Sequence, residues 1–502
     1  MGIHISFTEI MEVKALKKIL SASVAVLLIL ASLVSCASNE DEQSNSDIGN
    51  YSDNAIYNES DLGAIGDPNA NAGTPSGDNA NAETPAGDSA NAGTPSTDNG
   101  GSSNTTTKPA VSVTESSAGL AFELNADGQG YTLVGKGTCT ATSIVIDGHS
   151  GLPVTRIGYG AFSGDKKITS VKIGNYVESI GDYAFENCSG ITSLTIGDNV
   201  KIIEDYCFRY CTGLTSINLG KSMQRICYGA FYKASNIATI TLPDTVRSIE
   251  EYAFDKTAYY DDQSKWSNKV LYIGKHLIKG DNSISGTYTV KSGTISIAEA
   301  AFAAYDSGGN NFTYPAITSI SIPDSVKGIS EKAFYMANKL GTISGGAGLE
   351  YVGAHAFTNS KYYNTSSNWK SNVLYVGKAA VAGKTSISGA ITIADGTKAI
   401  ADMAFASCSN ATGITIPDSV VYVGEYSFLN CAKLANVNMG SGVKEIGAYA
   451  FKGCSALGSV TVKKSEGWKA DGVAIPATEM ADKSKAAIQL VTTASGKLWL
   501  CG

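Results

Sequence analysis

Apolar and polar positions recur with a period of about 23 residues between residues 161 and 462. Each unit reads apolar-x-x-apolar-x-apolar, then a turn such as "PDSV" or "GDNV", then Ile-Gly-x-Tyr-Ala-Phe-x-x-Cys, with variations. A phenylalanine marks each unit, at four successive spacings of 23 and then at wider ones. The positions are Phe162, Phe185, Phe208, Phe231, Phe254, Phe302, Phe334, Phe357, Phe405, Phe428 and Phe451.

The pattern within one unit predicts two local structures. Alternation in "ITSLTI", residues 191–196, indicates a short strand with Leu194 and Ile196 facing inward. The segment "EDYCFRYC", residues 204–211, is too short for a stable free helix. It is expected to form a helical turn with Phe208 packed beneath the neighbouring strand. One unit cannot cover its own apolar face, so the sequence predicts a stacked solenoid.

A larger block of the chain is duplicated. Residues 258–275, "AYYDDQSKWSNKVLYIGK", align with residues 361–378, "KYYNTSSNWKSNVLYVGK", at an offset of 103. Each copy lies in a spacing of 48 between phenylalanines, so we predict β-rich inserts near 258–290 and 361–392, with "VLYIGK" and "VLYVGK" as strands. Residues 303–314 read as an added loop rich in Gly and Asn.

The first 36 residues are typical of an export signal. Lys14, Lys17 and Lys18 precede an apolar run over residues 19–33, which is short for a membrane span. The run ends in "LVSC", which resembles the bacterial lipobox and implies acylation at Cys36. Two or more acyl chains make membrane attachment durable. The alternative is a plain secretory signal with a chance cysteine.

Residues 37–118 have the composition of a disordered acidic stalk. They hold thirteen Asp and Glu residues against the single base Lys108, and few large apolar residues. Three near-identical decads, "ANAGTPSGDN", "ANAETPAGDS" and "ANAGTPSTDN", cover residues 70–99. Such a segment cannot bury enough surface to offset its ordering entropy. Charge repulsion is expected to extend it and hold the body away from the membrane.

The rest of the chain shows little sign of reactive chemistry. The chain's net charge of −8 is carried by the stalk, and a nearly neutral body argues against nucleic-acid binding. No CxxC pair occurs, and His149, His276 and His355 are scattered, which argues against zinc. Asp147, His149 and Ser150 are adjacent in sequence, whereas members of a catalytic triad converge from separate positions.

A cysteine column accompanies the phenylalanines. Cysteine follows Phe by three residues in five units, at Cys188, Cys211, Cys408, Cys431 and Cys454. Neighbouring strands lie about 4.8 Å apart, which leaves a Cys188–Cys211 disulfide open. The side chains of one column point the same way, however, which favours buried free thiols that act as small hydrophobes.

These units resemble the BspA-like leucine-rich repeat family, whose repeats follow the pattern "ITSITIPDSVTSIGDYAFYGC". The resemblance implies an N-terminal cap over residues 119–160, a leucine-rich repeat solenoid over 161–462 and a C-terminal segment over 463–502. It also implies a protein that is secreted or anchored at the bacterial cell surface, in some members an adhesin toward host matrix proteins or other cells. The family has no catalytic residues to carry over, so we expect neither an enzyme nor a cofactor.

Two binding surfaces are candidates. The first is the strand face, where alternation sends the third and fifth positions outward and is expected to form two polar ladders on one continuous sheet. These positions are Ser170, Lys172, Ser193, Thr195, Ser216, Asn218, Thr239, Thr241, Ser319, Ser321, Gly413, Thr415, Asn436 and Asn438.

The strand face suits a partner protein of the host or of a neighbouring cell, although Ser and Thr also simply tolerate a solvated strand. The second surface comprises aromatic side chains of the inserts as stacking platforms for glycans. Its residues are Tyr259, Tyr260, Trp266, Tyr362, Tyr363 and Trp369. Burial of both Trp side chains in the insert would weaken this alternative.

Overall fold

The computed structural model describes residues 113–502 apart from residues 126, 306–311, 471–472 and 502. Cys36, the predicted signal segment and most of the predicted stalk lie outside the described residues. No helix in the described part of the chain has the length and apolar character needed to cross a membrane.

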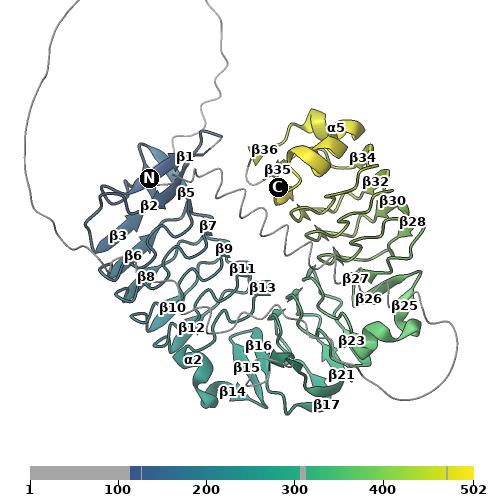
Figure 1. Ribbon diagram of the computed structural model, residues 1–502, viewed down its shortest axis with the longest axis horizontal. Helices are drawn as coiled ribbons and strands as arrows, with labels where there is room; N and C mark the ends of the chain where they lie inside the picture. The colour runs from purple at the N-terminus through teal and green to yellow at the C-terminus, as the bar shows by residue number, and fades with distance from the viewer. Residues whose placement is uncertain (1–112, 126, 306–311, 471–472, 502) are drawn as a thin grey trace, which may run out of the picture. The chain divides into compact units, whose positions relative to one another are not determined.

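Each repeat contributes two short strands to opposite sides of a stack (Figure 1). We call the two resulting series the inner ladder and the outer ladder. The inner ladder consists of β5 (Leu152–Ile157), β7 (Ser179–Ile180), β9 (Ile202–Ile203), β11 (Arg225–Ile226), β13 (Ser248–Ile249), β18 (Ser296–Ile297), β22 (Gly328–Ile329), β24 (Tyr351–Val352), β29 (Ala399–Ile400), β31 (Tyr422–Val423) and β33 (Glu445–Ile446).

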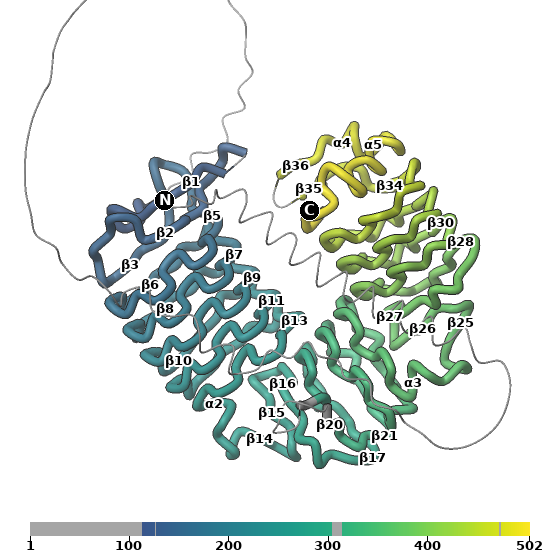
Figure 2. The backbone as a smooth tube through the Cα atoms, in the orientation of Figure 1, coloured from purple at the N-terminus to yellow at the C-terminus, as the bar shows by residue number. Residues whose placement is uncertain are grey.

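The outer ladder holds the strand that the alternating pattern predicted. Its members are β3 (Ser143–Ile146), β6 (Ser170–Ile173), β8 (Ser193–Thr195), β10 (Ser216–Asn218), β12 (Thr239–Thr241), β17 (Ser285–Thr289), β21 (Ala316–Ile322), β23 (Thr342–Gly345), β28 (Gly389–Thr392), β30 (Ala411–Ile416), β32 (Asn436–Met439) and β34 (Ser459–Val462). Within each sheet of this ladder the strands pair in parallel, so that Ile217 lies beside Ile240 and Ile414 beside Val437. Paired positions such as Ser216 and Thr239 are 23 residues apart, which confirms the predicted solenoid of about 23-residue repeats; Figure 2 shows the successive turns of the backbone.

The phenylalanine column forms the centre of the core. All eleven rings are at most 2% exposed. Consecutive rings stack with centroids 5.1–5.7 Å apart, in three runs: 162 to 254, 302 to 357 and 405 to 451. Each ring thus covers the apolar face of its neighbour, which is why one repeat alone would not be stable.

The segment around each phenylalanine is a run of turns where the sequence suggested a helical turn. Tyr206 and Tyr210 have φ of 54° and 60°, values that a right-handed helix excludes. Their N–H groups donate to the carbonyls of Tyr228 and Tyr232 in the next repeat, at 2.8 and 3.0 Å. The backbone therefore bonds between repeats at this corner, and stacking overrides the local helical preference.

The cysteine column is explained by a hydrogen bond as well as by volume. The nine described cysteines are buried free thiols, as the sequence favoured. Each of Cys188, Cys211, Cys431 and Cys454 donates from Sγ to the carbonyl of the Phe one repeat earlier, at 3.0–3.2 Å. Burial raises the pKa of the Cys188 thiol to about 12, so that it stays protonated.

The two inserts have the same secondary structure, which confirms the duplicated block. The first contains α2 (Ala258–Asp261), the 3-10 turn η2 (Gln263–Lys265), β14 (Trp266–Ser267), β15 (Val270–Ile273) and β16 (His276–Gly280). The second contains α3 (Lys361–Asn364), η3 (Ser366–Asn368), β25 (Trp369–Lys370), β26 (Val373–Val376) and β27 (Ala379–Gly383).

Each insert interrupts the inner ladder. β15 and β16 form an antiparallel hairpin, and β16 then pairs in parallel with β18. β27 pairs with β29 in the same way. The hairpins therefore take the ladder positions that β13 and β24 would otherwise hold. They divide the solenoid into three blocks of repeats: the first carries the phenylalanines from 162 to 254, the second those from 302 to 357, and the third those from 405 to 451. The added loop forms a small hairpin of β19 (Ala304–Tyr305) and β20 (Phe312–Thr313).

Caps close both ends of the stack. At the start, β1 (Ala121–Leu124), β2 (Tyr131–Gly135) and β4 (Gly148–His149) join the sheet of β5. The C-terminal cap contains β35 (Trp468–Ala470), β36 (Val473–Ala474), α4 (Ala477–Ala481), α5 (Lys483–Ile488), the π-helical turn η4 (Gln489–Thr493) and β37 (Trp499–Cys501). β37 pairs antiparallel with β33 and with β35, and Trp468 of β35 and Trp499 of β37 are buried.

Candidate functional site

The residues predicted for the strand face all lie on the outer ladder. Ser193 lies beside Ser170, and Thr195 beside Lys172, in the pairing of β6 with β8. Ser170, Ser319 and Ser321 are half-buried, as is Gly413. The exposed residues are Lys172, Ser193, Thr195, Ser216, Asn218, Thr239, Thr241, Thr415, Asn436 and Asn438.

The expectation of one continuous sheet is wrong. The outer ladder divides into separate sheets: β3-β6-β8, β10-β12, β17-β21-β23 and β28-β30-β32-β34. The inserts account for two of the interruptions because they separate β12 from β17 and β23 from β28 along the chain. The polar positions are therefore brought together in four groups.

The aromatic side chains of the inserts are partly exposed, and hydrogen bonds within each insert hold them in place. Both tryptophans are half-buried, and each indole N–H donates within its own insert: Trp266 to the Tyr260 carbonyl at 3.1 Å, and Trp369 to the Tyr363 carbonyl at 2.7 Å. The Tyr259 and Tyr362 hydroxyls donate to the carbonyls of the following hairpins. These contacts fix the rings as part of the insert's structure.

The inner ladder contains a variable column that the sequence analysis missed. One repeat position, the first residue of each two-residue strand, holds Ser179 and Ser248 in some repeats but Arg225, Tyr422 and Glu445 in others. The available signal in the sequence was a large or charged residue at a position where other repeats have Ser. The sequence alone could not explain this residue, because the side chains that it contacts belong to other blocks.

The blocks converge on this column. The Ile249 N–H of β13 donates to the Ser330 hydroxyl, just past β22, at 3.0 Å, and the Glu299 N–H donates to the Ile249 carbonyl at 2.8 Å. Gly328 lies so close to the first block that a Cβ there would be 1.9 Å from the Arg247 carbonyl oxygen. Glycine is therefore required where β22 meets β13.

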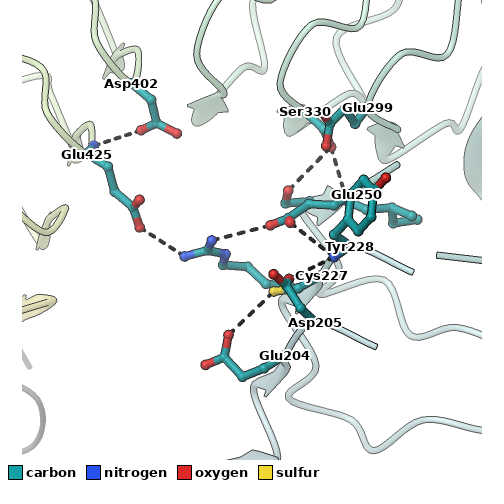
Figure 3. Close-up of polar contacts among 12 residues, drawn as sticks. Glu204, Asp205, Cys227, Tyr228, Glu250, Glu299, Ser330, Asp402 and Glu425 are labelled. Atoms are coloured by element: carbon teal, nitrogen blue, oxygen red, sulfur yellow. Dashed lines mark hydrogen bonds and ion pairs between the residues drawn. The ribbon is translucent and has the colours of Figure 1, made fainter. Parts of the chain in front are cut away.

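Ion pairs join the first block to the third. Arg225 contacts Glu425 at 3.0 Å and Glu250 at 3.4 Å (Figure 3). Arg247 contacts Glu445 at 3.0 Å. The Arg225 and Arg247 side chains are 33% and 24% exposed, so these pairs are partly shielded from water. The Arg225–Glu425 and Arg247–Glu445 pairs each join residues that are about 200 positions apart in the sequence.

Carboxyl groups around these pairs have raised pKa values. Burial raises the pKa of Glu250 to about 7, against the opposing effect of Arg225. Burial and the neighbouring Glu425 carboxylate raise the pKa of Asp402 to about 8. Asp402 accepts hydrogen bonds from the Tyr422 hydroxyl at 2.6 Å and the Tyr351 hydroxyl at 3.2 Å. Much of this polar network is therefore close to its titration range at neutral pH.

Asp205, Cys227 and Glu250 are the one described group with a metal-like arrangement, their ligand atoms lying within 4.8 Å of one another. Their contacts already serve the fold. The Tyr228 N–H donates to Asp205 and Glu250, at 3.1 Å each, and Cys227 lies 3.7 Å from a Glu204 oxygen (Figure 3). Burial and Glu250 raise the pKa of the Cys227 thiol, which opposes metal ligation.

Comparisons with solved structures find leucine-rich repeat proteins of low identity. A T. pallidum leucine-rich repeat protein is 17% identical, covering 48% of this chain and 87% of that chain, with a TM-score of 0.28. A leucine-rich cell surface protein from Faecalibacterium prausnitzii is 24% identical, covering 66% and 95%, with a TM-score of 0.25. The pneumococcal vaccine antigen PcpA is 15% identical, covering 76% and 97%, with a TM-score of 0.25. A search of curated proteins finds no match.

The family is shown by the repeats themselves. A model described as the BspA type leucine-rich repeat region matches in six copies, over residues 137–261, 308–390 and 376–467. These ranges together span more than half of the 502 residues, and they contain the phenylalanine, cysteine and two-strand pattern described above. The chain therefore belongs to the BspA-type leucine-rich repeat family.

Proposed function

We propose that this chain is a lipid-anchored protein of the bacterial cell surface that binds partner proteins of a host or neighbouring cell through its outer ladder. Family membership supports an interaction role at the cell surface, since proteins of this kind are typically scaffolds without enzymatic activity. The proposed layout is a signal segment to residue 36, a stalk after it and then the binding body. The stalk ends before the predicted residue 118, because the Ser116 and Ser117 N–H groups already donate to the Gly148 and Val145 carbonyls of the N-terminal cap.

The exposed polar groups of the outer ladder carry the proposal. Parallel register repeats small hydroxyl and amide side chains along each sheet at the strand spacing of about 4.8 Å. Ser216 and Asn218 lie beside Thr239 and Thr241, and Asn436 beside Gly413. Donors and acceptors on a rigid backbone need little ordering on binding, which favours an extended protein partner held by many weak contacts.

A triple substitution tests the surface. The full-length chain with Ser193→Arg, Ser216→Arg and Thr239→Arg is compared with a control carrying Ser267→Arg, Ser283→Arg and Ser366→Arg, all exposed and located outside the outer ladder. Binding is measured against immobilised extracellular-matrix proteins, and folding by circular dichroism. We expect only the outer-ladder triple to lose binding. Loss in the control alone, with both variants folded, would place the site elsewhere.

The anchor has its own test. Cys36→Ser removes the thiol that would receive the lipid, so we expect the variant to be absent from the detergent phase of a Triton X-114 partition. Ala37→Ser is the matched control and should remain in that phase. Equal retention of both variants would rule out Cys36 as the anchor.

Glycan binding by the insert aromatics is the second candidate, supported by the partial exposure of both tryptophans. Replacement of Trp369 by Phe keeps an apolar ring but removes the larger stacking surface and the indole donor. Glycan-array binding that is unchanged by Trp266→Phe and Trp369→Phe together would exclude these rings as the platform.

A further inference from the structure

A cavity lies on the inner side of the solenoid where residues of all three blocks meet. Its volume is about 370 Å³, within the usual range for small-ligand sites. Arg247 comes from the first block, Lys327 and Glu350 from the second, and Lys398 and Lys444 from the third. The cavity therefore brings together residues that the two inserts separate along the chain.

One repeat position supplies most of the lining. Arg247, Lys327, Glu350, Lys398 and Lys444 each directly precede a strand of the inner ladder. Their backbones are fixed by hydrogen bonds between repeats, for example from the Glu350 N–H to the Lys327 carbonyl at 2.9 Å. The side chains are therefore presented from a rigid frame, at successive steps of the ladder.

The charges of the lining do not balance. Glu350 and Glu445 are the carboxylates, and each already pairs with a cation: Glu350 with Lys327 at 2.8 Å, and Glu445 with Arg247 at 3.0 Å. Lys398 and Lys444 have no ion-pair partner among the described residues. The cavity thus carries two uncompensated positive charges, on Lys398 and Lys444. Around them lie two ion pairs, Lys327 with Glu350 and Arg247 with Glu445.

The rest of the wall limits the size and type of ligand. Ala347 and Gly348 form a side without large side chains, and glycine is required at 348 because a Cβ there would be 1.8 Å from the Asp324 carbonyl oxygen. Val421 adds an apolar surface, whereas Tyr422 is 3% exposed and offers little stacking area. The cavity therefore suits a compact polar ligand better than a flat aromatic one.

We propose that this cavity binds an acidic sugar unit, with its carboxylate or sulfate on Lys398 and Lys444 and its hydroxyls donating to Glu350 and Glu445. An acidic peptide side chain would satisfy the lysines but would bring no hydroxyl donors for the two carboxylates. The site is separate from the outer ladder and from the insert aromatics, and it does not depend on the proposed protein partner.

The test measures binding of three probes to the full-length chain by isothermal titration calorimetry: glucuronic acid, glucose 6-sulfate and glucose. We expect one or both anionic probes to bind, glucose to bind at least tenfold more weakly, and affinity to fall with added salt, because charge-assisted hydrogen bonds carry the contact. Glucuronic acid alone would identify a carboxylate site, and glucose 6-sulfate alone a sulfate site. Absence of binding by both anions at millimolar concentration would overturn the proposal.

A lysine pair supplies the matched control. The double variant Lys398→Gln and Lys444→Gln should weaken the anionic probe about tenfold or more, since two charge-assisted contacts are lost. Lys166→Gln with Lys167→Gln removes the same charge from exposed positions and should leave affinity unchanged. Equal affinity in both double variants would overturn the assignment, whereas the arginine triple on the outer ladder should leave sugar binding intact.

Discussion

The same repeats form the outer and the inner ladder, but the two ladders differ in how much their side chains vary from one repeat to the next. The outer ladder repeats small polar groups, and its strands pair with those of neighbouring repeats. The inner ladder holds Arg225, Tyr422 and Glu445 at a position where other repeats have Ser, and Arg225 and Glu445 form ion pairs with other blocks. A repeat protein thus keeps one face regular and uses the other to fix how its blocks meet.

Loss of a central phenylalanine should damage both ladders most. Phe208 is fully buried between Phe185 and Phe231, with ring centroids 5.2 Å from each. Phe208→Ala should lower the free energy of unfolding by about 3–5 kcal/mol, measured by urea titration. Phe208→Leu, which leaves a smaller cavity, should cost clearly less. A loss below about 1 kcal/mol for the alanine variant would show that the column is not the spine of the core.

Breaking the contact between blocks should have the next largest effect. Arg225→Leu leaves Glu425 and Glu250 without their cation, and we expect a loss of about 2 kcal/mol. Arg156 occupies the same position of an earlier repeat and is exposed, so Arg156→Leu is the matched control, expected within about 0.5 kcal/mol. Similar losses in the two variants would mean that the ion pairs add nothing specific.

Stability should also depend on pH through the inner ladder. The native chain keeps protons on Glu250 and Asp402 up to about pH 7 and 8, whereas the unfolded chain releases them near their ordinary values of 4.5 and 3.8. The native state therefore binds more protons in this window, and the free energy of unfolding falls as pH rises from about 5 to 8.

Asp402→Asn should make that decline shallower by up to about 1.4 kcal/mol per pH unit, because an amide does not titrate. Urea midpoints between pH 5 and 8 measure the slope. Exposed Asp395→Asn is the control and should leave the slope as it is. A native chain whose stability rises across this window, with Asp402→Asn following the same curve, would contradict the assignment.

The smallest change is expected on the outer ladder. Ser216 is exposed, and Ser216→Ala should alter the free energy of unfolding by less than about 0.5 kcal/mol. Ser330 is fully buried and accepts from the Ile249 N–H, so Ser330→Ala should cost about 1 kcal/mol or more. The two variants therefore compare an exposed position of the outer ladder with a buried position beside the inner ladder. Equal changes in the free energy of unfolding would remove the distinction between the ladders.

The sequence by itself determined the repeat, the strand of the outer ladder, the phenylalanine core and the two inserts. Period, alternation and the offset of 103 are properties that neighbouring repeats share, and each repeat packs mainly on its neighbours. The corner at Tyr206 became a run of turns because its N–H groups bond to the next repeat. That outcome requires a stacked partner, which a single unit of sequence does not display.

Only the tertiary structure decided which charged residues meet. The pairing of Arg225 with Glu425, and the cavity bordered by Lys398 and Lys444, depend on how one block lies against another. The angle at such a junction is set by packing among residues far apart in the chain, such as the approach of Gly328 to Arg247. A local pattern carries no record of that angle, so the inner surface became visible only in three dimensions.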